Sequence, residues 1–294
     1  MSGSPPAVGQ PAPDGDRDPR ADEPRQHAVP IRRYSLPMTA PTIVPDFRAR
    51  LRSSDFLLGT WLTLLDPVAA ELLAGSGFDF LVADGEHGPL ATADLVAILI
   101  ATRAAGVPVL ARVGANEPVR IMHALDSGAS GVVVPQIRTV ADAERAVAWC
   151  RYPPVGLRGI APRRASEFGR RTADYLAAAN ELVTCCIQIE TREALDDLDP
   201  ILSVPGVDAL LIGPNDLSAA LGHTGDLGHP EVEAAIARVL ERAAAHGVPA
   251  GIWTPSATMT RARRAQGFRF TTVGADYGFM LAAADAAVRE VAAG

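Results

Sequence analysis

Eight short apolar segments, separated by stretches with helical periodicity, recur from about residue 56 to the end of the chain. These segments are apolar throughout rather than at every second residue, which is typical of strands in a parallel sheet covered on both faces. Eight such strands, each followed by a helix, predict an α/β fold of the (β/α)8 TIM barrel type. The expected strands are 57–64, 78–83, 107–113, 131–135, 183–189, 208–212, 248–253 and 270–273.

Helix-start signals support the same alternation. Asp66 precedes Pro67, Thr92 precedes Asp94, and Thr139 precedes Asp142, each at the beginning of a stretch with helical period. A doubly wound open sheet is the alternative arrangement, but it more commonly carries a Gly-rich phosphate-binding turn after its first strand. The Asp66-Pro67 pair stands there instead, so the barrel is favoured. The expected helices include 67–74, 91–105, 118–125, 140–150 and 231–245.

The first 45 residues differ from the rest of the chain. They contain 10 of the 24 prolines, five acidic residues and five arginines, with almost no periodic hydrophobicity. Such a segment buries too little apolar surface to offset the entropy of ordering it. We therefore expect a disordered tail over residues 1–45 and a barrel domain over residues 46–294.

The composition excludes several classes of chemistry. All 27 basic residues other than histidine are arginine, and the chain has no lysine. Schiff-base aldolases, pyridoxal-phosphate enzymes and P-loop nucleotidases need a lysine amine, so none of them fits. The net charge of −7 argues against a nucleic-acid partner. Three cysteines form no disulfide framework and no apolar run reaches the ~18 residues of a membrane span, so we expect a cytoplasmic protein.

Polar side chains stand where the expected strands end, which is the active-site face of a barrel. Glu190 and Asp216 follow the fifth and sixth strands, which are neighbours around the ring. Two oxygen ligands with open positions suit a hard divalent cation such as Mg2+ or Mn2+. The polar groups at strand ends are Asp84-Gly85-Glu86-His87, Arg112, Pro135-Gln136, Gln188-Ile189-Glu190, Gly213-Pro214-Asn215-Asp216 and Trp253-Thr254.

For several of these residues a purely structural role is the alternative to a role in the active site. Glu190 and Asp216 stand where each would cap a following helix. His87, beside a glycine and a proline, suits a turn with one backbone hydrogen bond. Arg112 suits a structural ion pair with Asp84.

Several motifs, in order and at fitting spacing, resemble the metal-dependent pyruvate aldolases of the 4-hydroxy-2-oxoheptane-1,7-dioate and 2-dehydro-3-deoxyglucarate aldolase family. The resemblance covers roughly residues 56–290 and leaves out the tail. The segment Trp253-Thr254-Pro255-Ser256 departs from it, because smaller residues are expected there. The motifs are Gly59-Thr60-Trp61, Gly77-Phe78-Asp79, Asp84-Gly85-Glu86-His87, Leu125-Asp126-Ser127-Gly128-Ala129, Val134-Pro135, Arg151-Tyr152-Pro153-Pro154-Val155-Gly156-Leu157-Arg158-Gly159, Gln188-Ile189-Glu190-Thr191 and Ile212-Gly213-Pro214-Asn215-Asp216-Leu217-Ser218.

The resemblance implies a phosphoenolpyruvate/pyruvate-domain-like barrel and a role for each matched residue. Glu190 and Asp216 bind the divalent metal, which is Mg2+, Mn2+ or Co2+. His87 is the acid/base residue, and Asp126 is linked to its function, with Asp84 as the alternative partner. Arg112 contacts the keto oxygen of pyruvate, and Gln188 contacts the substrate. We also expect Trp61 to contact the substrate, and backbone N–H groups near Gly213 and Asn215 to hold its carboxylate.

The expected reaction is the reversible cleavage of a 4-hydroxy-2-oxo acid into pyruvate and an aldehyde through a metal-stabilised pyruvate enolate. The expected assembly is a homo-oligomer, a hexamer, in which the final helical stretch 280–293 packs across subunits. An acyl-CoA lyase of the malyl- or citramalyl-CoA type is an alternative, with Arg163-Arg164 and Arg170-Arg171 for the CoA phosphates. An oxaloacetate decarboxylase using the same metal enolate is another, and a barrel that only binds a 2-oxo acid is the non-enzymatic reading.

Overall fold

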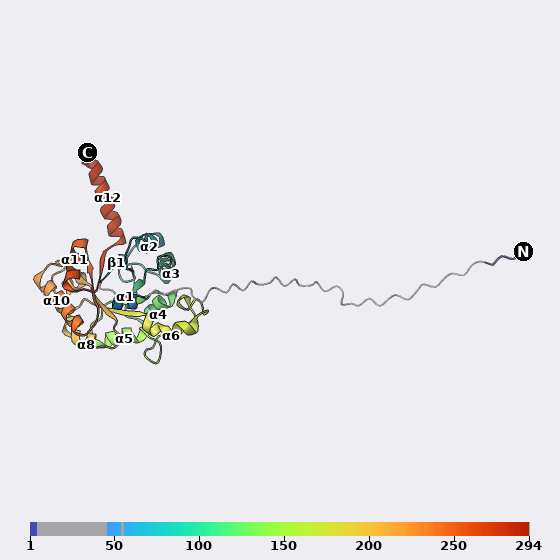
Figure 1. Ribbon diagram of the computed structural model, residues 1–294, viewed down its shortest axis with the longest axis horizontal. Coiled ribbons are helices and arrows are strands. Elements are labelled where there is room, and N and C mark those ends of the chain that lie inside the picture. The colour runs from blue at the N-terminus through green and yellow to red at the C-terminus, as the bar shows by residue number, and fades with distance from the viewer. Residues whose placement is uncertain (5–45, 54–55, 294) are drawn as a thin grey trace. The chain divides into compact units, whose positions relative to one another are not determined.

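Eight parallel strands pair in chain order and close into a barrel, as expected. Helices surround the strands (Figure 1). The computed structural model describes residues 1–4, 46–53 and 56–293; residues 5–45, most of the expected tail, lie outside the described residues. The strands are β1 Leu57–Leu62, β2 Phe80–Asp84, β3 Val109–Arg112, β4 Gly131–Val134, β5 Thr184–Ile189, β6 Ala209–Ile212, β7 Ala250–Thr254 and β8 Phe270–Ala275.

Each strand is followed by at least one helix. The helices are α1 Phe47–Ser53, α2 Pro67–Ala74, α3 Thr92–Ala101, α4 Pro118–Ser127, α5 Val140–Cys150, the 3-10 turn η1 Arg164–Ser166, α6 Thr172–Leu182, α7 Arg192–Asp196, α8 Leu198–Leu202, α9 Pro214–Ala220, α10 Pro230–Ala245, α11 Ala257–Gln266 and α12 Asp276–Ala292. None of the described helices is long and apolar enough to cross a membrane.

The three expected helix starts are confirmed. Asp66 caps α2 by accepting from the Ala69 backbone N–H, and Thr139 caps α5 together with Asp142. Helix α3 begins at Thr92, which is its first residue and not its cap. The Asp94 carboxylate, in the first turn of the helix, accepts the Ala91 backbone N–H at 2.9 Å. This N–H, at the residue before the helix, thereby gains a hydrogen-bond partner.

An aromatic cluster fills the N-terminal end of the barrel interior. The ring centroid of Phe47, from α1, lies 4.9 Å from that of Phe80 and 6.1 Å from that of Phe270, and all three side chains are at most 1% exposed. Two glycines on neighbouring strands, Gly59 and Gly251, provide the space for the Phe80 and Phe270 rings. A Cβ at Gly59 would lie 2.5 Å from the Phe80 ring, and one at Gly251 would lie 2.1 Å from the Phe270 ring. The N-terminal end of the barrel interior is therefore filled, and the active-site face of such a barrel is the opposite, C-terminal end.

The last helix begins at the barrel rim and leaves the barrel body (Figure 1). Asp276 is its one buried residue. The Asp276 carboxylate accepts the backbone N–H groups of Thr63 and Leu64, both at 2.9 Å, and the Thr63 hydroxyl at 2.6 Å. The start of α12 is thus tied to the loop that follows β1.

Candidate active site

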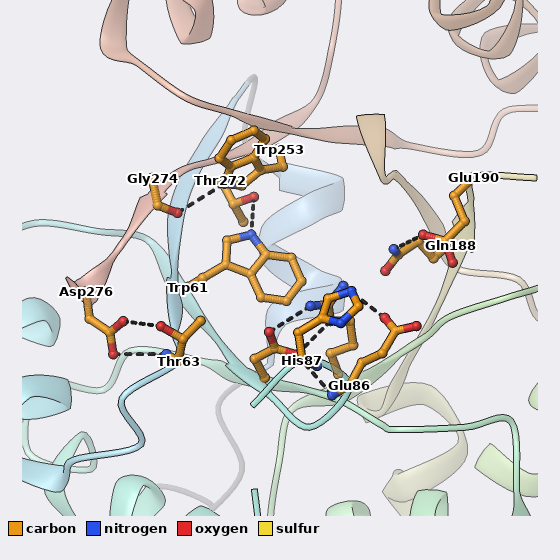
Figure 2. Close-up of polar contacts among 12 residues, drawn as sticks. Trp61, Thr63, Glu86, His87, Gln188, Glu190, Trp253, Thr272, Gly274 and Asp276 are labelled. Atoms are coloured by element: carbon orange, nitrogen blue, oxygen red, sulfur yellow. Dashed lines mark hydrogen bonds and ion pairs between the residues drawn. The ribbon is translucent and has the colours of Figure 1, made fainter. Parts of the chain in front are cut away.

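Side chains from several strand ends line one cavity of about 540 Å3. Glu190 is buried and is not part of the cavity wall; its Oε2 accepts a hydrogen bond from the amide of Gln188, which does line the cavity (Figure 2). Asp126 lies on α4 and is not part of the cavity wall. The sequence-predicted residues that do line the cavity are Trp61, Asp84, His87, Arg112, Gln188, Gly213, Asn215 and Asp216.

Arg112 is held by two carboxylates. Because the β2–β3 register pairs Asp84 with Arg112, Nε and Nη2 of the guanidinium donate to the Asp84 carboxylate at 2.8 and 2.7 Å. Nη1 lies 3.0 Å from Glu86 Oε2. Burial alone would raise the pKa of Asp84, but the hydrogen bonds and charge of Arg112 keep that pKa below its ordinary value. The alternative that Arg112 forms an ion pair with Asp84 is confirmed, and its guanidinium also faces the cavity.

Trp61 supports the same guanidinium from a second side. The Arg112 Cζ atom lies 4.3 Å from the centroid of the indole ring, a cation–π distance. The indole Nε1 donates to Thr272 Oγ1 at 2.7 Å (Figure 2). The position of Arg112 is therefore fixed before any ligand binds, which is what electrostatic stabilisation of a developing charge requires.

Three carboxylates from different strand ends influence one another. Burial is the main cause of the raised pKa of Glu190, and the negative charges of Glu86 and Asp216 add to it. Burial also raises the pKa of Glu86, again with a contribution from Asp216. The backbone N–H of Gln136, 2.9 Å from Glu190 Oε1, and the amide of Gln188 lower the pKa of Glu190 but offset only part of this effect. The repulsion is what a bound divalent cation would relieve.

The donor chemistry fits a hard divalent cation. Glu190 and Asp216 provide the carboxylate oxygens that Mg2+ and Mn2+ prefer. The buried Oε1 of Gln188 has no hydrogen-bond partner among the described residues, so it is a further unused oxygen beside Glu190. The donor chemistry is compatible with the predicted metal ligands, whose role stays a prediction.

Gly213 provides the space for these groups. A Cβ at this position would lie 2.5 Å from Glu190 Oε2 and 2.7 Å from Gln188 Nε2. The Gly213 backbone N–H donates to the Ile189 carbonyl at 3.3 Å, so it is used within the barrel. Its contribution to the site is therefore the absence of a side chain.

The helix-capping interpretations of the two acidic residues are wrong. Thr191, not Glu190, caps α7, because the Thr191 hydroxyl accepts the Ala194 backbone N–H at 3.2 Å. Asp216 lies inside the first turn of α9, whose N-cap is Gly213. Since neither carboxylate is used as a cap, both remain available for the site.

His87 and Asp126 lie in different surroundings. The His87 side chain lines the cavity, and its backbone N–H donates to Asp84 Oδ1 at 3.3 Å. Asp126 instead accepts from Arg158 Nη2 at 2.7 Å. The structure thus places Asp84, and not Asp126, in contact with the segment that carries His87. The expected link between Asp126 and His87 stays a prediction.

Sequence reasoning placed Trp253 at a strand end but gave no substrate role to four residues of the cavity wall. These four are Thr63, Trp253, Pro255 and Tyr277. Trp253 and Pro255 belong to the segment that departs from the resembled family, and Tyr277 follows β8. The same rule that found the other candidates, a position at or just beyond a strand end, would have found Tyr277.

Comparison with known proteins identifies the class of this barrel. Residues 57–283 match the model of the HpcH/HpaI aldolase/citrate lyase family. A 5-keto-4-deoxy-D-glucarate aldolase from Shigella dysenteriae is 41% identical over 79% of this chain and 91% of its own length. A family protein of known structure from Burkholderia cenocepacia is 43% identical, covers 83% of this chain and 98% of its own, and has a TM-score of 0.80. An HpcH/HpaI aldolase from Desulfitobacterium hafniense has the same TM-score at 27% identity, covering 84% and 97%.

The protein is therefore a TIM-barrel carbon–carbon lyase of the aldolase type. It belongs to the HpcH/HpaI aldolase/citrate lyase family. The aldolases of this family depend on a metal ion, which agrees with the carboxylate donors around Glu190.

Proposed function

We propose that this enzyme reversibly cleaves a 4-hydroxy-2-oxo acid into pyruvate and an aldehyde with the help of a divalent cation. The observation that carries the proposal is that the carboxylates of Glu190, Asp216 and Glu86, from three strand ends, repel one another near the fixed guanidinium of Arg112, in a chain without lysine. The compound in the name of the Shigella relative, 5-keto-4-deoxy-D-glucarate, is a 4-hydroxy-2-oxo diacid when numbered from its keto end. It belongs to the proposed substrate class.

Glu190 and Asp216 would hold the cation, which we propose to be Mg2+, Mn2+ or Co2+. When bound, the cation supplies a Lewis acid for the 2-oxo acid. Arg112 places its positive charge at the keto oxygen, where negative charge develops. Gln188 and the Asn215 segment line the same part of the cavity and contact the 2-oxo acid.

His87 moves the proton in this proposal. Its imidazole takes the proton from the C4 hydroxyl while the C3–C4 bond breaks and the electron pair stays on C3. The proton then returns to C3, so that an aldehyde and pyruvate leave. Asp84 positions His87 through the backbone N–H at 3.3 Å and holds Arg112 at the same time. Loss of such a base costs ~10²–10⁴-fold in rate.

The first test removes the metal and one of its proposed ligands. EDTA-treated wild-type protein should release no pyruvate from a 4-hydroxy-2-oxo acid until Mg2+, Mn2+ or Co2+ is added back. The variant Glu190→Gln should not recover, whereas Glu117→Gln, at an exposed side chain of α4's N-cap, should behave as wild type. Full activity of metal-free protein would disprove the proposal.

A second test separates the role of His87 from that of the metal ligands. His87→Ala should lower turnover by ~10²–10⁴-fold while leaving Mn2+ affinity unchanged in a calorimetric titration. An equal loss of both would make His87 a structural residue.

The structure does not favour the acyl-CoA alternative. Of the arginines expected to hold CoA phosphates, Arg164 is buried and donates to the carbonyls of Ser127 and Leu99 at 2.8 and 3.2 Å. Arg171 Nε donates to Asp174 at 3.2 Å. Decarboxylation of oxaloacetate would use the same site, and pyruvate release from oxaloacetate in the same assay measures it.

We propose that the enzyme works as a homo-oligomer, a hexamer, in the cytoplasm. Large apolar side chains of α12 are exposed in the single chain, among them Met280, Leu281, Val288 and Val291, and suit burial against another subunit. The three cysteines are free thiols, as in a reducing compartment. Sedimentation of a chain that ends at Leu281 should show a smaller assembly than the full chain.

A further inference from the structure

A second group of metal-ligating side chains lies outside the cavity. His223, His229 and Glu231 each offer one ligand atom, and these atoms all lie within 4.8 Å of one another. The two histidines lie in the loop between α9 and α10, and Glu231 is in the first turn of α10. None of the three lines the cavity that contains Arg112 and His87. The group is therefore separate from the candidate active site.

The backbone of the loop holds the two histidines in place. The His223 backbone N–H donates to the Ser218 carbonyl at 2.7 Å, and the Ser218 hydroxyl accepts the Gly225 N–H at 3.3 Å. The His229 N–H donates to the Asp226 carbonyl at 3.3 Å. Gly225 has a φ of 83°, in the left-handed region that lets the chain turn back. The loop thus folds both histidines against the start of α10.

The side chains themselves already meet. The ring centroids of His223 and His229 lie 3.4 Å apart, with 17° between the ring planes. His223 Nε2 lies 2.8 Å from Glu231 Oε2. The Glu231 backbone N–H donates to His229 Nδ1 at 3.2 Å, so this nitrogen carries a lone pair and its ring is the neutral form that binds metals. Two imidazoles and one carboxylate therefore converge on one place.

The spacing of these atoms suits a divalent transition-metal ion. With metal–ligand distances of about 2.0–2.1 Å, the 2.8 Å between His223 Nε2 and Glu231 Oε2 corresponds to an angle of roughly 84–89° at the ion. Neighbouring ligands of an octahedral or tetragonal ion form such an angle. Ligands on opposite sides of the ion are about 4.2 Å apart at the same bond length, so donors within 4.8 Å of one another need only a small side-chain rotation. The side chains of His223 and Glu231 are 25% and 52% exposed, so water can complete the coordination.

The ligand types distinguish this group from the carboxylates around Glu190. Imidazole nitrogen suits Zn2+, Ni2+ and Cu2+, whereas a hard ion such as Mg2+ prefers oxygen ligands. Nearby positive charge adds to the difference, because the charge of Arg192 acts on Glu231 and the first turn of α10 carries the positive end of the helix dipole. An ion that depends on negative charge is therefore disfavoured here, and an ion that bonds strongly to imidazole is favoured.

We propose that His223, His229 and Glu231 form a second metal site, which binds one divalent transition-metal ion such as Zn2+ or Ni2+. The ion links the loop after α9 to the start of α10. It stabilises the folded chain, because the unfolded chain does not hold the three ligands together. The site is independent of the proposed function, since it needs neither a 2-oxo acid nor any residue of the cavity.

The experiment is a calorimetric titration of metal-stripped, full-length protein with Ni2+. In Glu190→Gln, which lacks the ligand proposed for the catalytic ion, we expect one Ni2+ per chain with a dissociation constant in the micromolar range. His223→Ala or Glu231→Gln in this background should weaken binding by more than tenfold. A dissociation constant in the millimolar range, or one that His223→Ala leaves unchanged, overturns the inference.

His246→Ala is the matched control in the same background. His246 Nε2 also lies 2.9 Å from a carboxylate oxygen, that of Asp199, but belongs to no group of three such ligands among the described residues. This variant should bind Ni2+ as its parent does. A loss of binding equal to that of His223→Ala overturns the inference, because any exposed pair of histidine and carboxylate would then suffice.

A second readout counts the ligands and does not depend on the affinity. With one equivalent of Cu2+, the electron paramagnetic resonance spectrum of Glu190→Gln should show coupling to two nitrogen atoms, and to one nitrogen in the double variant that also carries His229→Ala. Ni2+ should also raise the Tm of Glu190→Gln and have a much smaller effect once His223→Ala is added. Coupling to a single nitrogen in Glu190→Gln, or to two that persist after His229→Ala, overturns the inference.

Discussion

Gly213→Ala tests whether the space beside Glu190 is essential for the site. The added Cβ would lie 2.5 Å from Glu190 Oε2 and 2.7 Å from Gln188 Nε2, whereas ordinary contact begins at 3.4 Å. The shortfall at the carboxylate is 3.4 − 2.5, or about 0.9 Å. The backbone at residue 213 has φ −92° and ψ 89°, so alanine meets no left-handed strain there. The expected effect therefore comes from displacement of the carboxylate.

Two magnitudes follow from this displacement. A catalytic group moved by about 1 Å loses on the order of 10²-fold in rate, so kcat/KM should fall about 100-fold. Overpacking costs about 1–3 kcal/mol, and the reduced entropy of the unfolded chain returns about 0.4–1 kcal/mol. The net loss in the free energy of unfolding should therefore be only about 0–2.6 kcal/mol. The variant should fold and be nearly inactive.

The assay combines pyruvate release with Mn2+ titration and urea unfolding. Gly75→Ala is the matched control, because its φ is −76° and the nearest atom to an added Cβ is a backbone oxygen at 3.5 Å. The control should keep wild-type kcat/KM and Mn2+ affinity. If Gly213→Ala keeps kcat/KM within threefold of wild type and binds Mn2+ normally, the reasoning about the Glu190 carboxylate is refuted.

Three further outcomes are expected. Asp84→Asn should lower the free energy of unfolding by about 1.5–3 kcal/mol in urea titrations, because Arg112 loses a charged acceptor but keeps Glu86. Phe47→Ala should cost about 3–5 kcal/mol in the same titration, because its buried ring packs against Phe80; a loss under about 1 kcal/mol would contradict this packing role. Burial raises the pKa of Tyr152 to about 12 from 10.0. Because the unfolded chain then ionises first, stability should fall as pH rises from 10 to 12, and less steeply in Tyr152→Phe.

Much of the barrel is predictable because its strands are buried on both faces. That burial makes the strands continuously apolar, and it leaves strand ends such as those at Asp84 and Arg112 as the places where polar residues appear. The exact ends are less predictable, since apolar residues such as Val107 pack into the core just outside a strand. Helix α1 escapes sequence reasoning because seven residues carry too little periodicity to stand out, although Phe47 packs against two strands.

Pairings between distant residues are the part that sequence reasoning does not reach. The motif around Asp126 is visible in the sequence, but its partner Arg158 is 32 residues away and is chosen by packing against Tyr152 and Tyr175. Likewise, the pairing of the Trp253 indole with the carbonyl of Gly274 depends on the end of β8, where Gly274 has a φ of 57°. A pattern can place such residues at a strand end, but only the closed barrel determines which of them meet.

The absence of lysine and the surroundings of Glu190 place two separate constraints on the chemistry. Without a lysine amine the chain cannot form the iminium that would accept the electron pair of a breaking carbon–carbon bond. The pKa values of Glu190 and Glu86 are raised by burial and by neighbouring carboxylates, so these acids are costly to keep ionised unless a positive charge joins them. Arg112 cannot be that charge alone, because Asp84 already neutralises it. A divalent cation would resolve both constraints, since the same ion would balance the carboxylates and stabilise the electron pair.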